Sequence, residues 1–335
     1  RDGSMTSHAA WPAGFGVDAS RLSFYGGVRD GGRLLWLVPF GAKRLATFDI
    51  DTGALSHVDV WPADSMPDGA FVGGVFDGRF VYLVPHSAPG IARIDTTATP
   101  VSLTMFAEWP AAASVHLGES FFGGHFDGNR TIWLCPFSST CVVRFDVPTT
   151  TMKCETAWPD GVFGTRSRKF AGINSDGNGY VWLVPHNADR VVRLDPRTGN
   201  MTGYPDWPAG FTLRTSAFLG GIFDGRGLWM VPHAVSSVVR VDTVSGNMQT
   251  YDAWPTGVDL SNGAFIGGCF DGKSIWLAPY TATAIVELRP AETIVYATRS
   301  MTSSDLRNHL DGGRPSSSAS LLPTLSVKPS RSTSL

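Results

Sequence analysis

The dipeptide Trp-Pro recurs six times along the chain, at residues 11, 61, 109, 158, 207 and 254, so successive copies lie 47 to 50 residues apart. A second series with the same period places an aromatic residue three positions before a proline; its aromatic residues are Trp36, Tyr82, Trp133, Trp182, Trp229 and Trp276. The two series together contain all 11 tryptophans of the chain. This regularity predicts a repeat architecture, because self-similarity at a fixed period of this length indicates a solenoid, a propeller or an array.

Each repeat divides into four short segments with the features of β-strands. The first is a stretch such as FVGGVFD (71–77), and an Asp-Gly pair separates it from a second such as VYLVP (81–85). Asp-Gly between two apolar runs is a strong hairpin signal, since the turn needs positive φ angles. A third stretch, such as IARID (91–95), and a fourth that ends in Trp-Pro complete the unit. Four short strands per unit, repeated six times, predict an all-β six-bladed β-propeller with four antiparallel strands per blade.

The order of these segments resembles kelch repeats, in which a hydrophobic hairpin also precedes a third strand and a Trp-bearing fourth strand. Kelch units place Gly-Gly at the end of the second strand, whereas this chain has VPH, VPF or APY there. The blade order also resembles NHL-type propellers with six blades and the virginiamycin B lyases with seven. The resemblance covers residues 5–298 and implies the architecture, while a propeller fold by itself hosts many unrelated activities. It implies that the glycines lie near the central axis and that the second-strand aromatic residues pack between blades.

The ends of the chain raise the question of how the ring closes. Residues 5–11 match residues 247–254 in register, so we expect the N-terminal segment to be the outer strand of the sixth blade; residues 292–299 are the alternative. We expect residues 1–4 to be a cloning remnant and residues 5–299 to form the propeller. Residues 300–335 are rich in Ser and Pro, and a segment of this composition is expected to be disordered alone.

Composition restricts the classes of partner. The formal net charge of −2 argues against nucleic acid and membrane surfaces as partners of the whole chain, and no apolar run reaches the length of a membrane span. The four cysteines, Cys135, Cys141, Cys154 and Cys269, form no zinc-binding pattern, and we expect reduced thiols that fill small apolar positions, although Cys135 and Cys141 could face each other. A monomeric cytoplasmic protein without cofactor or metal is therefore expected.

The residue that follows each second-strand proline defines the first candidate site. These residues are Phe40, His86, Phe137, His186, His233 and Tyr280. The loop after the second strand and the loop before the first strand lie on the same face of a propeller, so we expect the six side chains to ring one mouth of the channel. They form either a plug or a recognition ring. A metal site is disfavoured, since only His186 and His233 are on adjacent blades and no carboxylate recurs beside them.

A cluster of cations defines the second candidate site. The loops before the fourth and fifth blades carry Arg166, Arg168, Lys169 and Arg214, and with His186, Arg190 and His233 they are expected to form a positive sector. Asp68 and Glu119 are expected at blades two and three. Clustered positive charge predicts an acidic or phosphorylated partner.

The third strands carry a repeated Arg-x-Asp, as in Arg93/Asp95 and Arg193/Asp195, and the sixth repeat reads Glu287/Arg289 with the charges exchanged. Residues i and i+2 share one face of a strand. A structural ion pair tolerates the exchange, whereas a ligand-binding arginine does not, so we expect pairing within each strand.

The sequence contains no recognised catalytic motif. We therefore expect a non-enzymatic interaction module that binds a protein or peptide on the loop face. The alternatives are a lyase or hydrolase that uses His186 or His233 as general base with a bound metal, as the resemblance to virginiamycin B lyases implies, and a carbohydrate-binding lectin.

Overall fold

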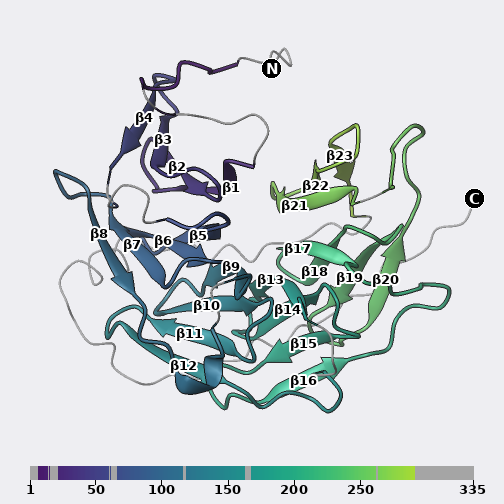
Figure 1. The fold of residues 1–335 in the computed structure, drawn as a ribbon. Coiled ribbons are helices and arrows are strands. Elements are labelled where there is room, and N and C mark those ends of the chain that lie inside the picture. Colours follow the sequence, from purple (N-terminus) through teal and green to yellow (C-terminus); the bar gives the residue numbers. More distant parts are fainter. Residues whose placement is uncertain are drawn as a thin grey trace, which may run out of the picture. The chain divides into compact units, whose positions relative to one another are not determined.

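The computed structural model describes residues 7–13, 15, 22–59, 61, 66–115, 118–162, 167–261 and 263–290. The chain divides into two units, Arg1–Ile294 and Val295–Leu335, and the second lies entirely outside the described residues, as do the predicted cloning remnant and the predicted tail. The first unit is a six-bladed β-propeller, as the repeat predicts, in which each blade is an antiparallel sheet with its strands in sequence order (Figure 1). No helix in the described ranges is long and apolar enough to cross a membrane.

The first three blades contain four strands each. Blade 1 consists of β1 (Phe24–Arg29), β2 (Leu34–Pro39), β3 (Leu45–Asp49) and β4 (Leu55–Val58); blade 2 of β5 (Phe71–Phe76), β6 (Phe80–Pro85), β7 (Ile91–Asp95) and β8 (Ser102–Phe106); blade 3 of β9 (Phe121–Phe126), β10 (Thr131–Pro136), β11 (Val142–Asp146) and β12 (Thr151–Glu155). One short 3-10 helix, η1 (Ala111–Ala113), lies between blades 2 and 3.

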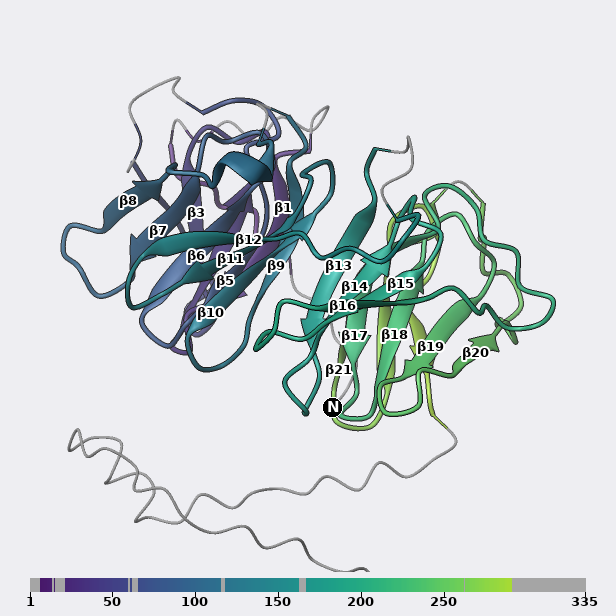
Figure 2. The same ribbon diagram turned by 90° about the horizontal axis from the view of Figure 1, so that it is seen from below.

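The remaining blades repeat the pattern up to the last outer strand. Blade 4 consists of β13 (Phe170–Ser175), β14 (Val181–Pro185), β15 (Val191–Leu194) and β16 (Met201–Tyr204); blade 5 of β17 (Phe218–Phe223), β18 (Gly227–Pro232), β19 (Val238–Asp242) and β20 (Met248–Tyr251); blade 6 of β21 (Phe265–Phe270), β22 (Ile275–Pro279) and β23 (Val286–Leu288). Figure 2 shows how the sheets stand next to one another when the molecule is turned by 90°.

Glycine is required where the inner strands approach one another at the axis. A Cβ atom on Gly73 would lie 3.4 Å from the Cα atom of Gly123, and one on Gly220 would lie 2.9 Å from the Cα atom of Gly267. Both Gly73 and Gly220 also have positive φ angles, +71° and +103°, which side chains disfavour. The first glycine of the Gly-Gly pair, or the single Gly172 of blade 4, therefore lets neighbouring inner strands touch through their backbones.

The second-strand aromatic residues form the core between blades, as predicted. Trp36, Trp133, Trp182 and Trp229 are each exposed by 1% or less. Trp182 of blade 4 belongs to the same apolar cluster as Phe218 of blade 5. Each sheet thus buries one face against the sheet that follows it.

In every blade except blade 3, the aspartate of the Asp-Gly hairpin binds this core aromatic residue. In blade 4, Asp176 accepts backbone N–H bonds within the turn through Oδ1, and the indole Nε1 of Trp182 donates to Oδ2 over 2.9 Å. The same bond joins Trp36 to Asp30, Trp229 to Asp224 and Trp276 to Asp271, and in blade 2 the Tyr82 hydroxyl donates to Asp77. Only residues with a donor, Trp or Tyr, occupy this position, although Phe is the commonest aromatic residue in the chain.

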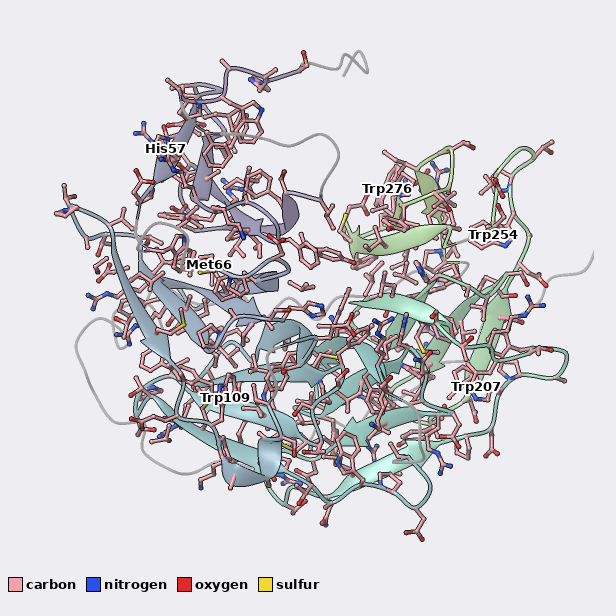
Figure 3. All side chains as sticks on the ribbon, in the orientation of Figure 1. His57, Met66, Trp109, Trp207, Trp254 and Trp276 are labelled. Carbon is pink, nitrogen blue, oxygen red and sulfur yellow. A yellow bond between two sulfur atoms is a disulfide. The ribbon has the colours of Figure 1, made fainter. Side chains whose placement is uncertain are left out.

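The Trp-Pro tryptophans lie beyond the fourth strands, not at their ends as predicted. β8 ends at Phe106 and β16 at Tyr204, so Trp109 and Trp207 belong to the connections between blades (Figure 3). Each stacks on the first Phe of the following blade, as Trp109 does on Phe121 with ring centroids 5.3 Å apart. The Nε1 atoms of Trp109, Trp158, Trp207 and Trp254 donate to carbonyls in the preceding blade, those of Pro89, Thr140, Asp189 and Ser236. Each such tryptophan therefore ties two blades together.

The predicted closure by the N-terminal strand is not found. Residues 7–12 form no strand, and the sixth sheet has three strands in the part of the chain that the structure describes. His8 packs against Phe48 and Trp11 stacks on Phe24, both in blade 1. Trp11 thus stacks on the blade that follows it, as the other five Trp-Pro tryptophans do. This stacking does not require residues 7–12 to form a strand of blade 6. The alternative closing strand, residues 292–299, lies outside the described residues.

The expected Arg-x-Asp pairs within strands are also wrong for blades 2 to 5. Asp95 pairs with Arg79 from the first hairpin of its blade, while Arg93 lies over the rings of Phe80 and Phe106. The aspartates instead accept turn N–H groups, as Asp95 does from Thr97, and the arginines cover aromatic residues or pair elsewhere. Only Glu287 and Arg289 in blade 6 pair as predicted, with two contacts of 2.9 Å.

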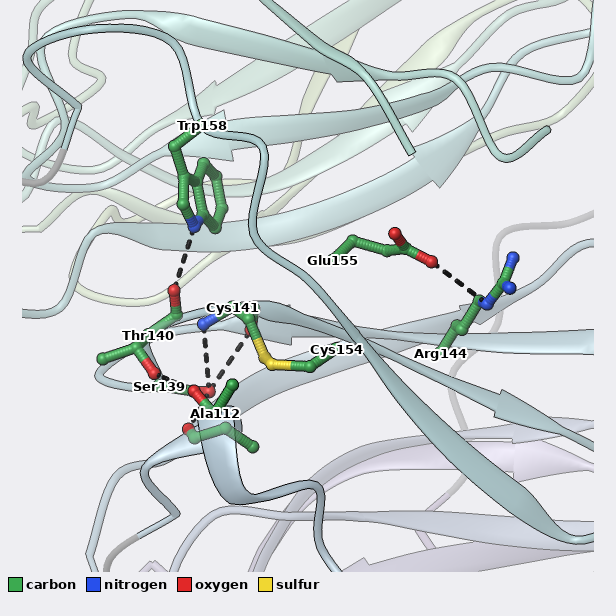
Figure 4. The surroundings of a disulfide bond; sticks show 9 residues. Ala112, Ser139, Thr140, Cys141, Arg144, Cys154, Glu155 and Trp158 are labelled. Atoms are coloured by element: carbon green, nitrogen blue, oxygen red, sulfur yellow. Dashed lines mark hydrogen bonds and ion pairs between the residues drawn. A yellow bond between two sulfur atoms is a disulfide. The ribbon is translucent and has the colours of Figure 1, made fainter. Parts of the chain in front are cut away.

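A disulfide joins Cys141, directly before β11, to Cys154 in β12, which corrects the expectation of four reduced thiols (Figure 4). Cys154 lies opposite Val143 in the strand pairing, so the disulfide fixes the outer edge of blade 3. Cys135 is buried as a thiol, and burial raises its pKa to about 12. Cys269 is an exposed thiol. Spacing along the sequence did not reveal the pair because its residues meet only through the register of two strands.

The buried Asp–Trp bond predicts a specific loss of stability. Trp182→Phe removes the indole donor and leaves Asp176 Oδ2 without it, whereas Nε1 of Trp133 is buried without a partner in the described structure. We expect Trp182→Phe to lower the free energy of unfolding by about 1–3 kcal/mol more than Trp133→Phe does. Urea denaturation of the two variants measures the difference, and equal losses would contradict the role of the bond.

The disulfide predicts a second effect on stability. Cys154→Ser opens a loop between residues 141 and 154 and should lower the free energy of unfolding by about 3 kcal/mol. Cys269→Ser, at an exposed free thiol, is the control and should have little effect. Thiol titration of the unfolded wild-type chain should find two thiols before reduction and four after it. Four thiols before reduction would show that the bond does not form in the isolated protein.

Candidate functional site

A belt of backbone hydrogen bonds links the blades at one end of the channel. In blade 2, the His86 N–H donates to the Ala70 carbonyl, and the Ser120 N–H of blade 3 donates to the His86 carbonyl over 2.9 Å. The same inter-blade bond recurs as Ala70 to Phe40, Lys169 to Phe137, Ala217 to His186 and Ala264 to His233, with distances of 2.7 to 3.1 Å. We call these five inter-blade bonds the belt. They place the predicted ring residues at the same height in successive blades.

The structure brings the six predicted ring residues together in a continuous arc. The ring centroids are 5.9 Å apart for Phe40–His86 and His86–Phe137, 5.4 Å for Phe137–His186, 6.1 Å for His186–His233 and 5.9 Å for His233–Tyr280. Each side chain follows the proline that ends the second strand of its blade, so the belt and the arc share their residues. The arc begins in blade 1 and ends in blade 6.

The three histidines of the arc share one hydrogen-bonding pattern. Nδ1 of His86, His186 and His233 lies 2.9, 3.0 and 3.3 Å from the carbonyls of Phe121, Phe218 and Phe265. A carbonyl only accepts, so Nδ1 carries the proton, and Nε2 of the neutral ring is an acceptor. Burial lowers the pKa of both His86 and His186 below the ordinary histidine value. These two side chains are therefore neutral at pH 7.

An apolar cavity of about 510 Å³ lies along the axis next to the arc. Its wall consists of the residue after the first Phe of each blade, together with neighbouring glycines; these residues are Tyr25, Val72, Phe122, Ala171, Leu219 and Ile266. Phe122 contacts both Phe137 and His86, which connects the cavity to the arc. A volume of this size holds a small molecule or one or two peptide side chains.

A few polar groups interrupt the apolar wall. His125 lies on β9 with Nε2 2.6 Å from the Ser175 hydroxyl, and burial lowers its pKa. The Tyr25 pKa is raised by burial and by the proximity of Tyr280, so the Tyr25 hydroxyl stays protonated and can donate a hydrogen bond. Tyr280 also lines the cavity and is exposed. Such a wall favours an apolar ligand that carries one or two polar atoms.

The predicted positive sector is largely neutralised. Arg168 forms two bonds of 2.6 Å with Glu119, and Arg190 pairs with its neighbour Asp189. Lys169 is buried, and this burial lowers its pKa. Arg214 is exposed and forms no ion pair among the described residues, while Arg166 lies outside them. Asp68, the other expected carboxylate, pairs with Lys43.

The Arg168–Glu119 pair lies at the rim of the arc. Both residues have positive φ angles, +57° and +55°, in the segments that lead into blades 4 and 3. Residues other than glycine rarely adopt this conformation. The equivalent residues of blades 2, 5 and 6, which also have positive φ angles, are the smaller Gly69, Ser216 and Gly263. The Arg168 guanidinium lies 6.0 Å from the centroid of Phe137. The pair therefore adds a polar, ion-paired element to an otherwise aromatic mouth.

No group of three or more His, Cys, Asp or Glu side chains that could hold a metal ion occurs in the described part of the chain. When the ring is neutral, Nε2 of His86, His186 and His233 is an acceptor that could take a proton from a ligand.

No protein-family model matches this sequence, and no curated protein matches it. Solved structures do resemble it in fold. Virginiamycin B lyase from Staphylococcus aureus has a TM-score of 0.59 and 15% identity, with 81% of this chain and 85% of that chain covered. YCF48 bound to D1 peptide has a TM-score of 0.56 and 15% identity, with 80% and 78% covered. The extracellular domain of a putative one component system from B. thetaiotaomicron has a TM-score of 0.58 and 14% identity, with 82% and 35% covered. At these identities the likeness shows the propeller fold alone.

The sequence indicated the arc but not the belt or the cavity wall. The belt uses the residue before the first Phe of blades 2 to 6, and this residue is Ala or Ser in each of them except blade 4, which has Lys169. A repeated small residue at that point was the available signal. The wall residues vary from Ala to Tyr, so no repeated residue type marked them.

The buried histidines predict a dependence of stability on pH. The pKa of His186 is lower in the folded protein than in the unfolded chain, where it is about 6.5. The unfolded state therefore binds more protons as the pH falls from about 6.5 towards the folded-state pKa, and the protein loses stability over that window. His186→Phe, which copies Phe137 of the preceding blade, should flatten this loss in urea denaturation at pH 5–7. Tyr280→Phe, at the same position of blade 6, is the control, and an unchanged slope in His186→Phe would contradict the assignment.

Proposed function

We propose that this chain is a non-enzymatic binding module that holds a protein or peptide partner at the mouth formed by the arc. The observation that carries the proposal is the junction of the arc with the axial cavity, because an aromatic rim beside an apolar cavity suits a peptide with a large apolar side chain. Peptide binding by a protein of the same fold, YCF48 bound to D1 peptide, supports the class of function.

The cavity and its rim bind different parts of the proposed partner. The cavity accepts an apolar side chain of the partner, and the backbone of the partner crosses the mouth, where the Nε2 atoms of the arc histidines accept N–H groups. The neutral state of His186 suits this role, because a protonated ring has no acceptor.

Preference for an acidic or phosphorylated partner is the finer hypothesis. It requires Arg168 to exchange Glu119 for an anionic group of the partner, since Arg190 is also paired and Lys169 is buried. The rim position of the Arg168–Glu119 pair makes this exchange accessible, as both side chains are exposed by 40% or more.

A lyase that uses His186 or His233 as general base is the second candidate function. The two imidazoles are neighbours in the arc, and each presents an unprotonated Nε2 in its neutral form. Incubation with quinupristin, the ligand in a solved structure of an inactive virginiamycin B lyase of this fold, tests the candidate directly. A cleavage product that disappears in both His186→Ala and His233→Ala would favour the enzyme over the binding module.

Filling the cavity should abolish partner binding without unfolding the protein. Ile266 is half-buried on the cavity wall in blade 6, and Ile266→Trp places a larger ring in the space. We expect peptides selected from a random library on the wild-type chain to lose binding to this variant by about tenfold or more. Val244→Trp, at a residue that is 77% exposed, is the control. Unchanged binding to Ile266→Trp would place the site elsewhere.

The charge preference has its own pair of variants. If an anionic partner displaces Glu119, Glu119→Gln should tighten the binding of acidic and phosphorylated peptides, and Arg168→Gln should weaken it. Fluorescence anisotropy at low and high salt measures both effects. Equal affinities for acidic and neutral peptides in all three proteins would contradict the preference and leave the apolar mouth as the recognition element.

A further inference from the structure

Five junctions between neighbouring blades are built alike. At each, one belt bond joins the blades, and the inner strands β1, β5, β9, β13, β17 and β21 pack in succession. Except in blade 4, which has Ile173 at this position, the second glycine of the Gly-Gly pair in the following blade receives a side chain of the preceding one: a Cβ atom on Gly74 would lie 2.8 Å from Val28 Cγ2, and one on Gly268 would lie 2.8 Å from Ile222 Cδ1. We call the face of each sheet that packs against the following blade its back, and the face that packs against the preceding blade its front. The back of one blade is therefore complementary in shape to the front of the next.

The sixth junction is missing from the described structure. The Ser23 N–H and the Tyr280 carbonyl, the pair that would complete the belt, form no bond in the described ranges. β21 does not pack against β1 as the other inner strands pack against their neighbours, and the two stand apart in Figure 1. Trp11 is nevertheless stacked on Phe24, just as the other Trp-Pro tryptophans stack on the blades that follow them. Blade 1 therefore has the same outer stacking contact as blades that follow another blade.

The back of blade 6 exposes side chains that the other blades bury. Ile285 is 66% exposed, whereas Val238 at the same position of blade 5 is 1% exposed. Tyr280 is 57% exposed, Ala278 and Cys269 are exposed, and Trp276 (Figure 3) is only half-buried although its counterparts are exposed by 1% or less. On the opposite side, Leu22 is 47% exposed and Gly26 and Gly27 are exposed. Both faces are apolar and neither is covered by a described residue.

We propose that the faces of blades 6 and 1 form a docking slot for one further four-stranded β-sheet with the chemistry of this repeat, supplied by a partner. Continuity with the five existing junctions is the argument, since each face of the slot is one half of an interface that the molecule already forms. A single peptide strand does not suffice, because Tyr280 and Ile285 flank different strands, β22 and β23, and only a sheet covers both.

The groups that line the slot define the groups that its occupant must provide. The N–H group before its first strand donates to the Tyr280 carbonyl, and a carbonyl after its second strand accepts from Ser23. Its first strand carries a glycine pair that takes the Cys269 side chain, as Gly268 takes Ile222. Its loop between the second and third strands offers a carbonyl to the Trp11 indole, as Ser236 does to Trp254.

The first experiment tests whether blade 1 itself, or a second copy of the chain, fills the slot. In the junctions before blades 2, 5 and 6, the residue at the Cys269 position contacts the position equivalent to Gly27. A Cβ atom on Gly27 itself would first meet the end of the Leu35 side chain at 3.1 Å. We expect Gly27→Cys to form no disulfide with Cys269 under oxidising conditions, and Cys269 to react with maleimide at the rate of an exposed thiol. An intramolecular disulfide would mean direct closure, a disulfide-linked dimer would mean a second copy, and either result overturns the proposal.

The second experiment supplies the occupant. Residues 208–255 form one complete unit that ends in Trp-Pro, so this segment can replace residues 1–12 in register and precede residue 13 with the same dipeptide. We expect the added unit to slow maleimide labelling of Cys269 by roughly tenfold or more and to raise the melting temperature. The control carries Gly220→Val in the added copy only, where a Cβ atom would crowd the neighbouring inner strand, and should label at the rate of the wild-type chain.

The outcomes of the second experiment are distinct. Limited proteolysis reports whether the added unit folds, and the unit contains every group that the slot requires. If Cys269 labels at the wild-type rate, whether the added unit is folded beside the propeller or cleaved away from an intact propeller, the proposal is wrong. If the control also protects Cys269, the added segment covers this residue without docking in the slot, and the proposal is contradicted.

Discussion

The belt of backbone hydrogen bonds is the constraint on which the rest of the structure depends. Each belt bond uses the carbonyl of an arc residue, such as His86, as the acceptor for the next blade. Because backbone groups make the connection, the side chains of the belt residues are free to vary, and the arc can contain Phe, His and Tyr without any change in the position of the blades. The candidate site therefore lies on the most rigidly repeated part of the molecule, while the composition of its side chains remains open to selection for a partner.

Three further contacts complete each junction, at increasing distance from the axis. At the axis, glycines let the inner strands touch, and between the sheets a core Trp or Tyr is oriented by the hairpin aspartate. At the outer end, the Trp-Pro indole stacks on the next blade and donates to the previous one. A junction thus has an inner, a middle and an outer connection. At the back of blade 6, the side chains that would pack against a following blade have no such neighbour among the described residues. This explains why Cys269, Tyr280 and Ile285 of blade 6 are exposed.

The neutralised cations change the emphasis of the candidate site. Charges close in sequence suggested a positive sector, but Arg168 and Arg190 pair with Glu119 and Asp189 before any ligand binds. What remains distinctive at the mouth is apolar and aromatic: the arc, Phe122 and the cavity behind them. An acidic partner would have to compete with an existing ion pair, whereas an apolar side chain would fill existing space.

The sequence by itself determined the number of blades, the strands within each, the core position of Trp182 and its counterparts, and the place of the arc residues. All of these features repeat with one period, and equivalent residues of successive repeats take equivalent places in the folded blades. Only the tertiary structure decided the features that depend on which side chains meet across that period. The pairing of Cys141 with Cys154, of Asp95 with Arg79 rather than Arg93, and of Glu119 with Arg168 each joins residues from different segments, and strand register and blade contact choose those partners. The position of Trp11 on blade 1, and the uncovered faces beside it, followed from geometry for the same reason: a repeat specifies each junction between neighbours, but it does not specify how the first and last blades meet.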